Sequence, residues 1–145
     1  MPIIKVTARV YVHATEEKDR VMKALMNVFP RELWGDVEVR EERYEGHYGN
    51  PIIVLEAGIS DPGKAFQAFK SMVERLDEAD RRYLLASLEE RVDKNGTLYI
   101  RLSKQQAYLG SLRVFESDDV IKVTVGFQGS RRRALKEYHE VIGGV

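Results

Sequence analysis

The sequence predicts one α+β domain spanning residues 1–145, a mainly antiparallel sheet with helices packed on one face, in the order β-α-β-β-α-α-β-β-α. Two observations lead to this prediction. Several short segments alternate apolar and polar residues, which is typical of half-buried strands, while others repeat apolar residues every three or four positions, as amphipathic helices do. The strands also occur in hairpin-like pairs instead of alternating strictly with helices, which favours antiparallel pairing.

The first strand and the first helix have the clearest patterns. Residues 4–12 alternate strictly between apolar and polar side chains, so they predict a strand with one buried face. Thr15 is the expected cap of the following helix, with Glu16 and Glu17 in its first turn, where the helix dipole favours acids. Residues 21–29 carry the apolar stripe, and the proline after them is expected to end the helix.

The next segments predict a hairpin and two helices. Residues 37–40 and 52–59 read as strands that pair in antiparallel fashion, with the loop 45–51 as the hairpin tip. Asp61, which is followed by proline at the first helical position, begins one helix. Asp77 begins another, whose apolar positions continue to Val92.

The last third predicts two more strands and a helix. Residues 98–102 and 121–127 alternate as strands, and residues 103–109 form a short helical turn between them. A short extra strand is possible at residues 112–115. Ser130 is the expected cap of the final helix.

The strand at 52–59 carries apolar side chains on both faces. Ile52 and Val54 lie on one face, while Ile53 and Leu55 lie on the other, because side chains alternate along a strand. The helices can cover only one face, so we expect a homodimer to cover the second. The alternative is that residues 113–119 of the same chain fold back over it.

The charge balance limits the partners of the chain. Lys and Arg number 23, as do Asp and Glu, so the formal net charge is zero. This balance disfavours indiscriminate binding to nucleic acids, because phosphates require an excess of cations. From Thr97 onward, however, eight basic residues accompany five acidic ones, which makes the carboxy-terminal third net +3.

Composition also points to a compartment. The absence of cysteine excludes disulfides, thiolate metal sites and cysteine nucleophiles, and it favours the reducing cytoplasm. No apolar run approaches the roughly 20 residues that span a bilayer, and the amino terminus has no signal-peptide layout, so no membrane partner is expected. The balanced charge at 32% of residues and the three asparagines resemble the composition of thermophile proteins.

The sequence lacks the spacing of residues that is typical of catalytic and metal-binding sites. His13, His47 and His139 lie on separate elements without the spacing of metal ligands. Residues 46–49 lack the following Lys-Ser/Thr of a phosphate loop, and no serine has the context of a nucleophile elbow. We therefore expect no catalytic residue, no metal site and no cofactor.

The outward face of the sheet is the first candidate site. If the first, fourth and fifth strands are neighbours, their outward positions combine cations with aromatic rings, namely Lys5, Arg9, Tyr11, Tyr99, Arg101 and Lys122. Single-stranded RNA is bound by such a mixture, because rings stack on unpaired bases while cations hold phosphates. The alternative is an ordinary solvated sheet face, on which tyrosine is common.

A second candidate lies at the start of the final helix. Arg131, Arg132 and Arg133 oppose the helix dipole there, at a cost of roughly 0.3–1 kcal/mol each when exposed. A bound anion would relieve this conflict, so we expect the cluster to be the main anion contact, and its replacement by glutamate to leave the fold intact or slightly more stable. The alternative is that these arginines reach into solvent or pair with acids. His47 in the hairpin tip, and Lys104 with Tyr108 in the short helical turn, complete the expected RNA contacts.

Three segments carry a resemblance to a known family. They are residues 10–16 (VYVHATE), 45–52 (EGHYGNPI) and 106–110 (QAYLG), of which the second is the most specific. Together they resemble an archaeal family of small RNA-binding proteins described as predicted exosome subunits. The resemblance implies a fold similar to that of a large-subunit ribosomal protein that binds ribosomal RNA, and a non-catalytic role near RNA processing or degradation.

Two functions follow from the sequence. The leading one is an RNA-binding accessory protein, with single-stranded RNA and exosome subunits as expected partners. The alternative is a protein-interaction or dimeric scaffold domain that has the fold of an RNA binder but binds no RNA.

Overall fold

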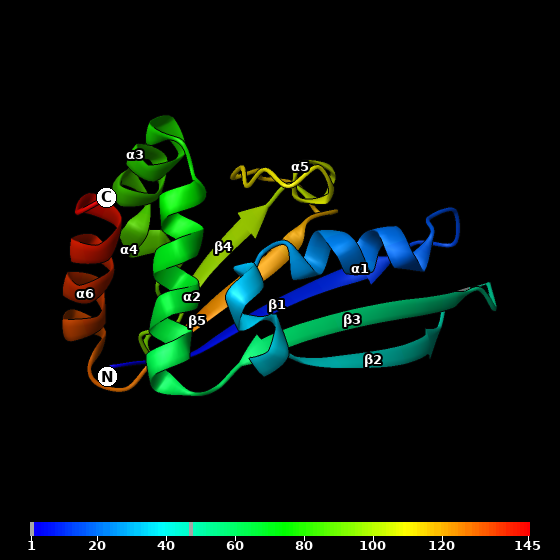
Figure 1. Cartoon of the computed structure of the whole chain (residues 1–145), viewed down its shortest axis with the longest axis horizontal. Coiled ribbons are helices and arrows are strands. Elements are labelled where there is room, and N and C mark those ends of the chain that lie inside the picture. Colours follow the sequence, from blue (N-terminus) through cyan, green and yellow to red (C-terminus); the bar gives the residue numbers. More distant parts are fainter. Residues whose placement is uncertain (1, 47) are drawn as a thin grey trace.

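The computed structural model describes residues 2–46 and 48–145. In this part of the chain, five strands form one antiparallel sheet in the order β2-β3-β1-β5-β4. The helices pack on one face of it, and in Figure 1 α2 crosses in front of the strands while α1 runs along β1. This arrangement confirms the predicted fold class. The strands are β1 (Ile3–Val12), β2 (Glu38–Glu45), β3 (Pro51–Ile59), β4 (Leu98–Leu102) and β5 (Ile121–Phe127).

The helical elements follow the predicted order, with some additions. They are α1 (Lys18–Met26), the 3-10 helix η1 (Arg31–Asp36), α2 (Pro62–Arg75), α3 (Glu78–Ala86), α4 (Leu88–Arg91), α5 (Lys104–Tyr108) and α6 (Arg131–Gly143). The helix expected from Asp77 to Val92 is divided at Ser87, which caps α3 and precedes α4. No helix among the described residues is long and apolar enough to cross a bilayer.

The core lies between the helices and one face of the sheet. Ala8 and Val10 of β1 are buried, as are their partners Ala57 and Leu55 on β3 and Val123 on β5. Apolar burial of this kind is the main stabilising term of the fold. At the far end of the core, the buried Tyr138 hydroxyl donates to the carbonyl oxygen of Gly96 at 2.6 Å, and burial raises the pKa of that hydroxyl.

The beginning of α1 differs from the prediction. The helix begins at Lys18, so its cap residue is Glu17 and not Thr15, and Glu17 makes no side-chain cap bond. Glu16 instead accepts a hydrogen bond from the backbone N–H of His13 at 3.0 Å and pairs with Lys104. The acid that was expected to favour the helix dipole therefore serves a tertiary contact.

The extra strand expected at residues 112–115 is reduced to a single bridge. Val114 pairs with Leu102 at the outer edge of β4. Asp80, a buried acid of α3, accepts hydrogen bonds from the Val114 N–H at 2.9 Å and from Arg113 Nε at 3.1 Å. This contact holds the segment against α3 and covers the β4 edge, so the segment does not fold back over the open face next to β3.

The alternation predicted for β3 is confirmed by its register. Leu55 and Ala57 face the helices, while Val54 faces the opposite side next to Tyr11 of β1 and Glu42 of β2. Val54 is nevertheless only 2% exposed, because the chain itself covers it. The burial of Val54 removes part of the apolar argument for a homodimer, which stays a prediction, and Ile52 on the same face remains partly exposed.

Candidate nucleic-acid interface

One line of side chains crosses the face of the sheet that the helices leave open. Arg40 of β2 lies opposite Glu56 of β3, which lies opposite Arg9 of β1. Arg9 also faces Lys122 of β5, which in turn faces Arg101 of β4. With about 4.8 Å between neighbouring strands, this cation row runs roughly 19 Å across the sheet. Four of its five members are basic.

The positive charge is concentrated on one half of the open face. Arg9 pairs with Glu56 at 3.6 Å between Nη1 and Oε2, so β3 partly neutralises it. On β1, β5 and β4, no outward-facing position is acidic, as the residues there are Lys5, Thr7, Arg9, Tyr11, Lys122, Thr124, Gly126, Tyr99 and Arg101. A chain of zero net charge therefore presents a local basic surface, which phosphate binding requires.

Aromatic rings flank the cation row on both sides. Tyr11 lies two residues beyond Arg9 on β1, and Lys122 Nζ is 5.9 Å from the centre of its ring. Tyr99 lies two residues from Arg101 on β4, in the opposite direction along the sheet. The Tyr99 hydroxyl donates to Asp93 at 2.9 Å, a bond that raises the pKa of the hydroxyl and fixes the ring. Both rings are partly exposed and can stack on a base.

The structure brings together half of the residues predicted as RNA contacts. Those that share the open face are Lys5, Arg9, Tyr11, Tyr99, Arg101 and Lys122. The condition on which this prediction rested is met, because β1, β5 and β4 are consecutive in the sheet. His47 lies outside the described residues. The other five predicted contacts lie elsewhere.

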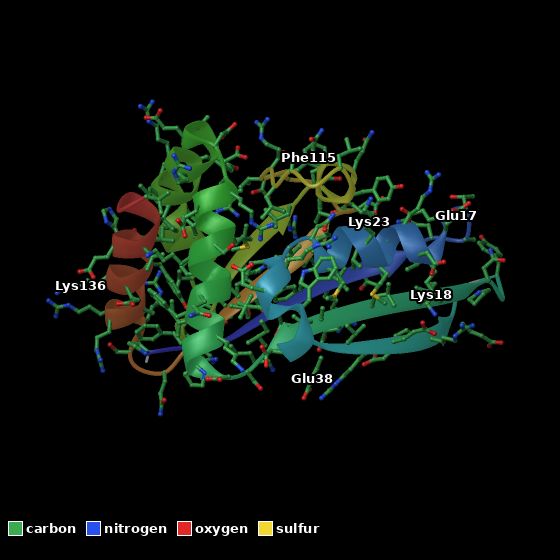
Figure 2. The ribbon with its side chains drawn as sticks, in the orientation of Figure 1. Glu17, Lys18, Lys23, Glu38, Phe115 and Lys136 are labelled. Atoms are coloured by element: carbon green, nitrogen blue, oxygen red, sulfur yellow. The ribbon has the colours of Figure 1, made fainter. Side chains whose placement is uncertain are left out.

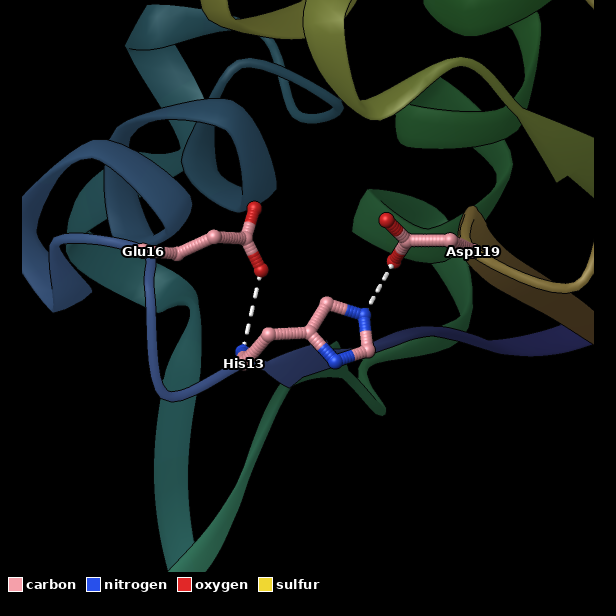
Figure 3. A group of neighbouring side chains, drawn as sticks. All are labelled: His13, Glu16 and Asp119. Atoms are coloured by element: carbon pink, nitrogen blue, oxygen red, sulfur yellow. Dashed lines mark hydrogen bonds and ion pairs between the residues drawn. The ribbon is translucent and has the colours of Figure 1, made fainter.

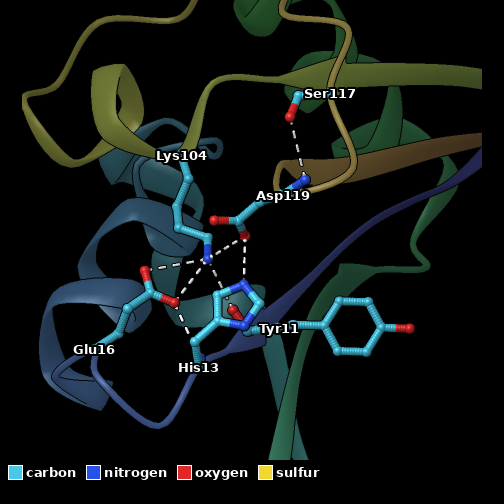
Figure 4. Close-up of polar contacts among 6 residues, drawn as sticks. All are labelled: Tyr11, His13, Glu16, Lys104, Ser117 and Asp119. Atoms are coloured by element: carbon cyan, nitrogen blue, oxygen red, sulfur yellow. Dashed lines mark hydrogen bonds and ion pairs between the residues drawn. The ribbon is translucent and has the colours of Figure 1, made fainter.

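Lys104 is engaged in a cluster inside the chain. Its ammonium donates to Glu16 Oε1 at 2.9 Å and to the Tyr11 carbonyl oxygen at 3.0 Å, and it lies 2.7 Å from Asp119 Oδ1. Figure 4 shows these groups converging on the lysine nitrogen. The side chain is only 11% exposed, so Lys104 supports the structure and is not available to a phosphate.

The same cluster contains a possible set of metal ligands. In Figure 3, the imidazole of His13 points at Asp119, and their Nε2 and Oδ1 atoms are 2.9 Å apart. One ligand atom from each of His13, Glu16 and Asp119 lies within 4.8 Å of the others. The Lys104 ammonium already supplies positive charge among these groups. Burial raises the pKa of the Asp119 carboxyl, but Lys104 and His13 lower it more, so the pKa lies below its ordinary value.

Tyr108 lies on the helical side of the molecule. Its ring contacts Lys23 Nζ at 4.8 Å and the Arg20 guanidinium at 5.6 Å. It lines a cavity of about 740 Å³ between α1, α5 and the segment that carries Phe115. Lys23 and Phe115 are labelled on this side of the molecule in Figure 2. Tyr108 therefore does not extend the open face.

The three arginines at the start of α6 differ in their contacts. Arg131 donates to the carbonyl oxygens of Glu89 at 2.9 Å and Val92 at 3.2 Å, at the end of α4. A cation is favourable there, because the last carbonyls of a helix lack partners. Arg132 and Arg133 are exposed. They follow Phe127, at the opposite end of β5 from Lys122, so they do not join the cation row.

Sequence reasoning missed Arg40 and Glu56 as members of the row. The strand that carries Arg40 was predicted to span only residues 37–40, whereas β2 runs from Glu38 to Glu45 and is exposed throughout. An edge strand without a buried face shows no apolar alternation, so the sequence pattern does not indicate where such a strand ends. The hairpin register places Arg40 opposite Glu56.

Comparison with known proteins adds independent information. A family model described as RNA binding matches residues 5–127. The RNA-binding protein PAB1135 of Pyrococcus abyssi is 38% identical over 140 residues, which cover 94% of this chain and 91% of that protein. The uncharacterized protein MJ0213 of Methanocaldococcus jannaschii is 31% identical over 120 residues, which cover 81% of this chain and 79% of that protein.

Solved structures share the fold over nearly the full length. Protein AF2318 from Archaeoglobus fulgidus has a TM-score of 0.82 at 30% identity, covering 96% of this chain and 99% of its own. Protein SSO0741 from Sulfolobus solfataricus has a TM-score of 0.80 at 26% identity, covering 97% of this chain and 98% of its own. The fold described above is thus common to several archaeal proteins.

Proposed function

Because this chain belongs to the RNA-binding family whose model matches residues 5–127, we propose that it binds single-stranded RNA on the open face of its sheet and catalyses no reaction. The observation that carries the proposal is the cation row with a tyrosine on either side of it. Cations that hold phosphates next to rings that stack on bases are the combination used by proteins that bind unpaired RNA.

The proposed path of the RNA crosses the sheet diagonally. Tyr11 and Tyr99 are four residue positions apart along the strand direction and two strands apart across the sheet. At about 3.4 Å per residue and 4.8 Å per strand, this separation is roughly 17 Å. The two rings therefore stack on different bases, and Lys122, Arg9 and Arg101 contact the phosphates between them.

This geometry implies weak and salt-dependent binding. Three phosphate contacts on a single strand give a slope of about −2 in a plot of log K against log salt concentration, at about 0.7 per contact. The acids of β2 and β3, including Glu42 and Glu56, limit further electrostatic attraction. Unpaired bases are required because rings can stack only on exposed base faces.

Titration of a fluorescently labelled single-stranded RNA, from about 50 to 200 mM salt, tests the proposal. The wild-type chain should bind with the slope given above, and the double variant Lys122→Glu/Arg101→Glu should lose binding at every salt concentration. The matched control is Arg132→Glu/Arg133→Glu, which makes the same change of charge at the start of α6 and should bind as the wild type does.

Two results would contradict the proposal. If the wild type binds no RNA even at low salt, the RNA-binding proposal fails. If the control variant loses binding and the open-face variant keeps it, the site lies at α6 instead.

A protein-interaction role is the second candidate function. The partly exposed side chains of Ile52 and Tyr44, which are cross-strand partners on β3 and β2, favour it. The partner would be a second copy of the chain or, as the family resemblance implies, exosome subunits. Sedimentation at micromolar concentration tests whether the partner is a second copy, because a species of 16.7 kDa would contradict a homodimer.

A further inference from the structure

A second cavity adjoins the open face at one end of the sheet. This tip pocket, with a volume of about 340 Å³, lies between the end of β1 and the tip of the β2–β3 hairpin. Residues 11–14 form one wall, and Gly46, Tyr48 and residues 50–52 form the other. Its size is near the lower end of the roughly 300–1,000 Å³ typical of small-molecule sites, so it suits one planar ring system and its sugar.

Two glycines fix the shape of this pocket. The Gly46 N–H donates to the Asn50 carbonyl oxygen at 2.6 Å, and a Cβ on Gly46 would lie 2.8 Å from that same oxygen. Gly49 has a φ of +76°, a conformation that favours glycine. The Gly49 N–H donates to the Gly46 carbonyl oxygen at 3.1 Å. These two hydrogen bonds tie Gly46 to Gly49 and Asn50, and so hold this wall of the pocket in place.

The lining of the pocket suits a base better than a phosphate. Among the described lining residues, His13 alone can carry positive charge, and it is paired with Asp119 at 2.9 Å. The remaining walls are mostly apolar and include the rings of Tyr11 and Tyr48. Tyr48 is 90% exposed, so it presents a large surface to solvent. Flat apolar surfaces of this kind bind bases by stacking.

The pocket is continuous with the cation row through Tyr11. This residue lines the pocket, and its ring also lies 5.9 Å from Lys122 Nζ. Ile52, another lining residue, belongs to the open face as well. A strand whose phosphate contacts Lys122 therefore places a neighbouring nucleotide at the mouth of the pocket.

We propose that the tip pocket receives one unpaired nucleobase of the bound RNA, stacked against Tyr11 and Tyr48. This inference rests on the proposed function, because it assumes that RNA lies on the cation row. It assigns the hairpin tip a role in holding a base, while the cation row holds phosphates.

The test compares Tyr48→Ala, Tyr48→Phe and the wild type in binding a single-stranded RNA that contains 2-aminopurine. Tyr48→Ala should weaken binding about 5- to 150-fold, the equivalent of the ~1–3 kcal/mol of one stacked base. The slope against salt should not change, because no cation is removed. Tyr48→Phe keeps the ring and should bind and quench 2-aminopurine as the wild type does. Tyr83→Ala, which removes a partly exposed tyrosine from α3, is the matched control and should bind normally.

The outcomes separate the pocket from the proposed function. If the wild type binds RNA and Tyr48→Ala binds equally well, the pocket holds no base, while the open face keeps its role. Tyr48→Phe binding as weakly as Tyr48→Ala would also overturn the inference, because stacking requires only the ring. If the wild type binds no RNA, both proposals fail together.

Discussion

Lys104 and Asp119 form an ion pair in which the lysine Nζ lies 2.7 Å from Asp119 Oδ1. The same nitrogen binds Glu16 and the Tyr11 carbonyl oxygen. One cation thus joins the end of β1, the segment before α1, the start of α5 and the segment before β5. Tyr11 belongs to the open face and also lines the tip pocket. This cluster therefore holds in place the end of the sheet at which the two proposed sites meet.

Replacing Lys104 with methionine should lower the stability of the fold. The change leaves Glu16 and Asp119 without their shared cation and the Tyr11 carbonyl without its donor. We expect the free energy of unfolding to fall by about 1–3 kcal/mol, as measured by urea denaturation. Lys136→Met on the exposed side of α6 (Figure 2) is the control, with an expected change within about 0.5 kcal/mol. Equal stability of the two variants would show that the cluster contributes nothing.

The Asp119 carboxyl should make stability depend on pH in the acid range. Its pKa is lowered in the folded chain from the ordinary 3.8 because, although burial raises it, Lys104 and His13 lower it more. The folded state therefore gains stability that is complete above pH 3.8 and is lost as the pH falls through the lowered pKa. Because the carboxyl is half exposed, we expect its charge to contribute about 0.5–1 kcal/mol to the free energy of unfolding.

Comparing the wild type with Asp119→Asn in urea isolates this effect. The variant should be less stable at about pH 7, and the difference should shrink at the lowest pH at which both chains stay folded, because protonation removes the charge of the wild-type carboxyl. A difference that is the same at both pH values would mean that the charge of Asp119 is not responsible.

The elements with local signals could be predicted from the sequence. β4 and β5 have buried alternating faces, and Ser130 caps α6 through its Oγ, which accepts from the Arg133 N–H at 3.2 Å. The open-face residues of β1, β4 and β5 were identifiable for the same reason, since alternation alone assigns them to the face away from the core. β2 lacks a buried face, so its full length could not be predicted.

The contacts that sequence patterns cannot supply are those between distant residues. Glu16 was assigned to the first turn of a helix because the neighbouring residues suggest it, yet its partner Lys104 is 88 positions away. Arg131 was grouped with Arg132 and Arg133 because they are consecutive, but its acceptors lie 39 and 42 positions back in the chain. Only the three-dimensional structure shows which residues of a charged run already bind partners within the chain.

Arg131 should therefore prove structural, whereas Arg132 and Arg133 should not. Arg131→Ala leaves the carbonyl oxygens of Glu89 and Val92 without their donor, and we expect a loss of about 1–2 kcal/mol in the free energy of unfolding. Arg132→Ala and Arg133→Ala remove exposed side chains and should stay within about 0.5 kcal/mol of the wild type. Replacing all three with glutamate should likewise destabilise the fold, contrary to the expectation from the helix dipole alone, because an acid at 131 would face those carbonyl oxygens. Urea denaturation of the four variants decides this, and a triple variant as stable as the wild type would contradict the structural role of Arg131.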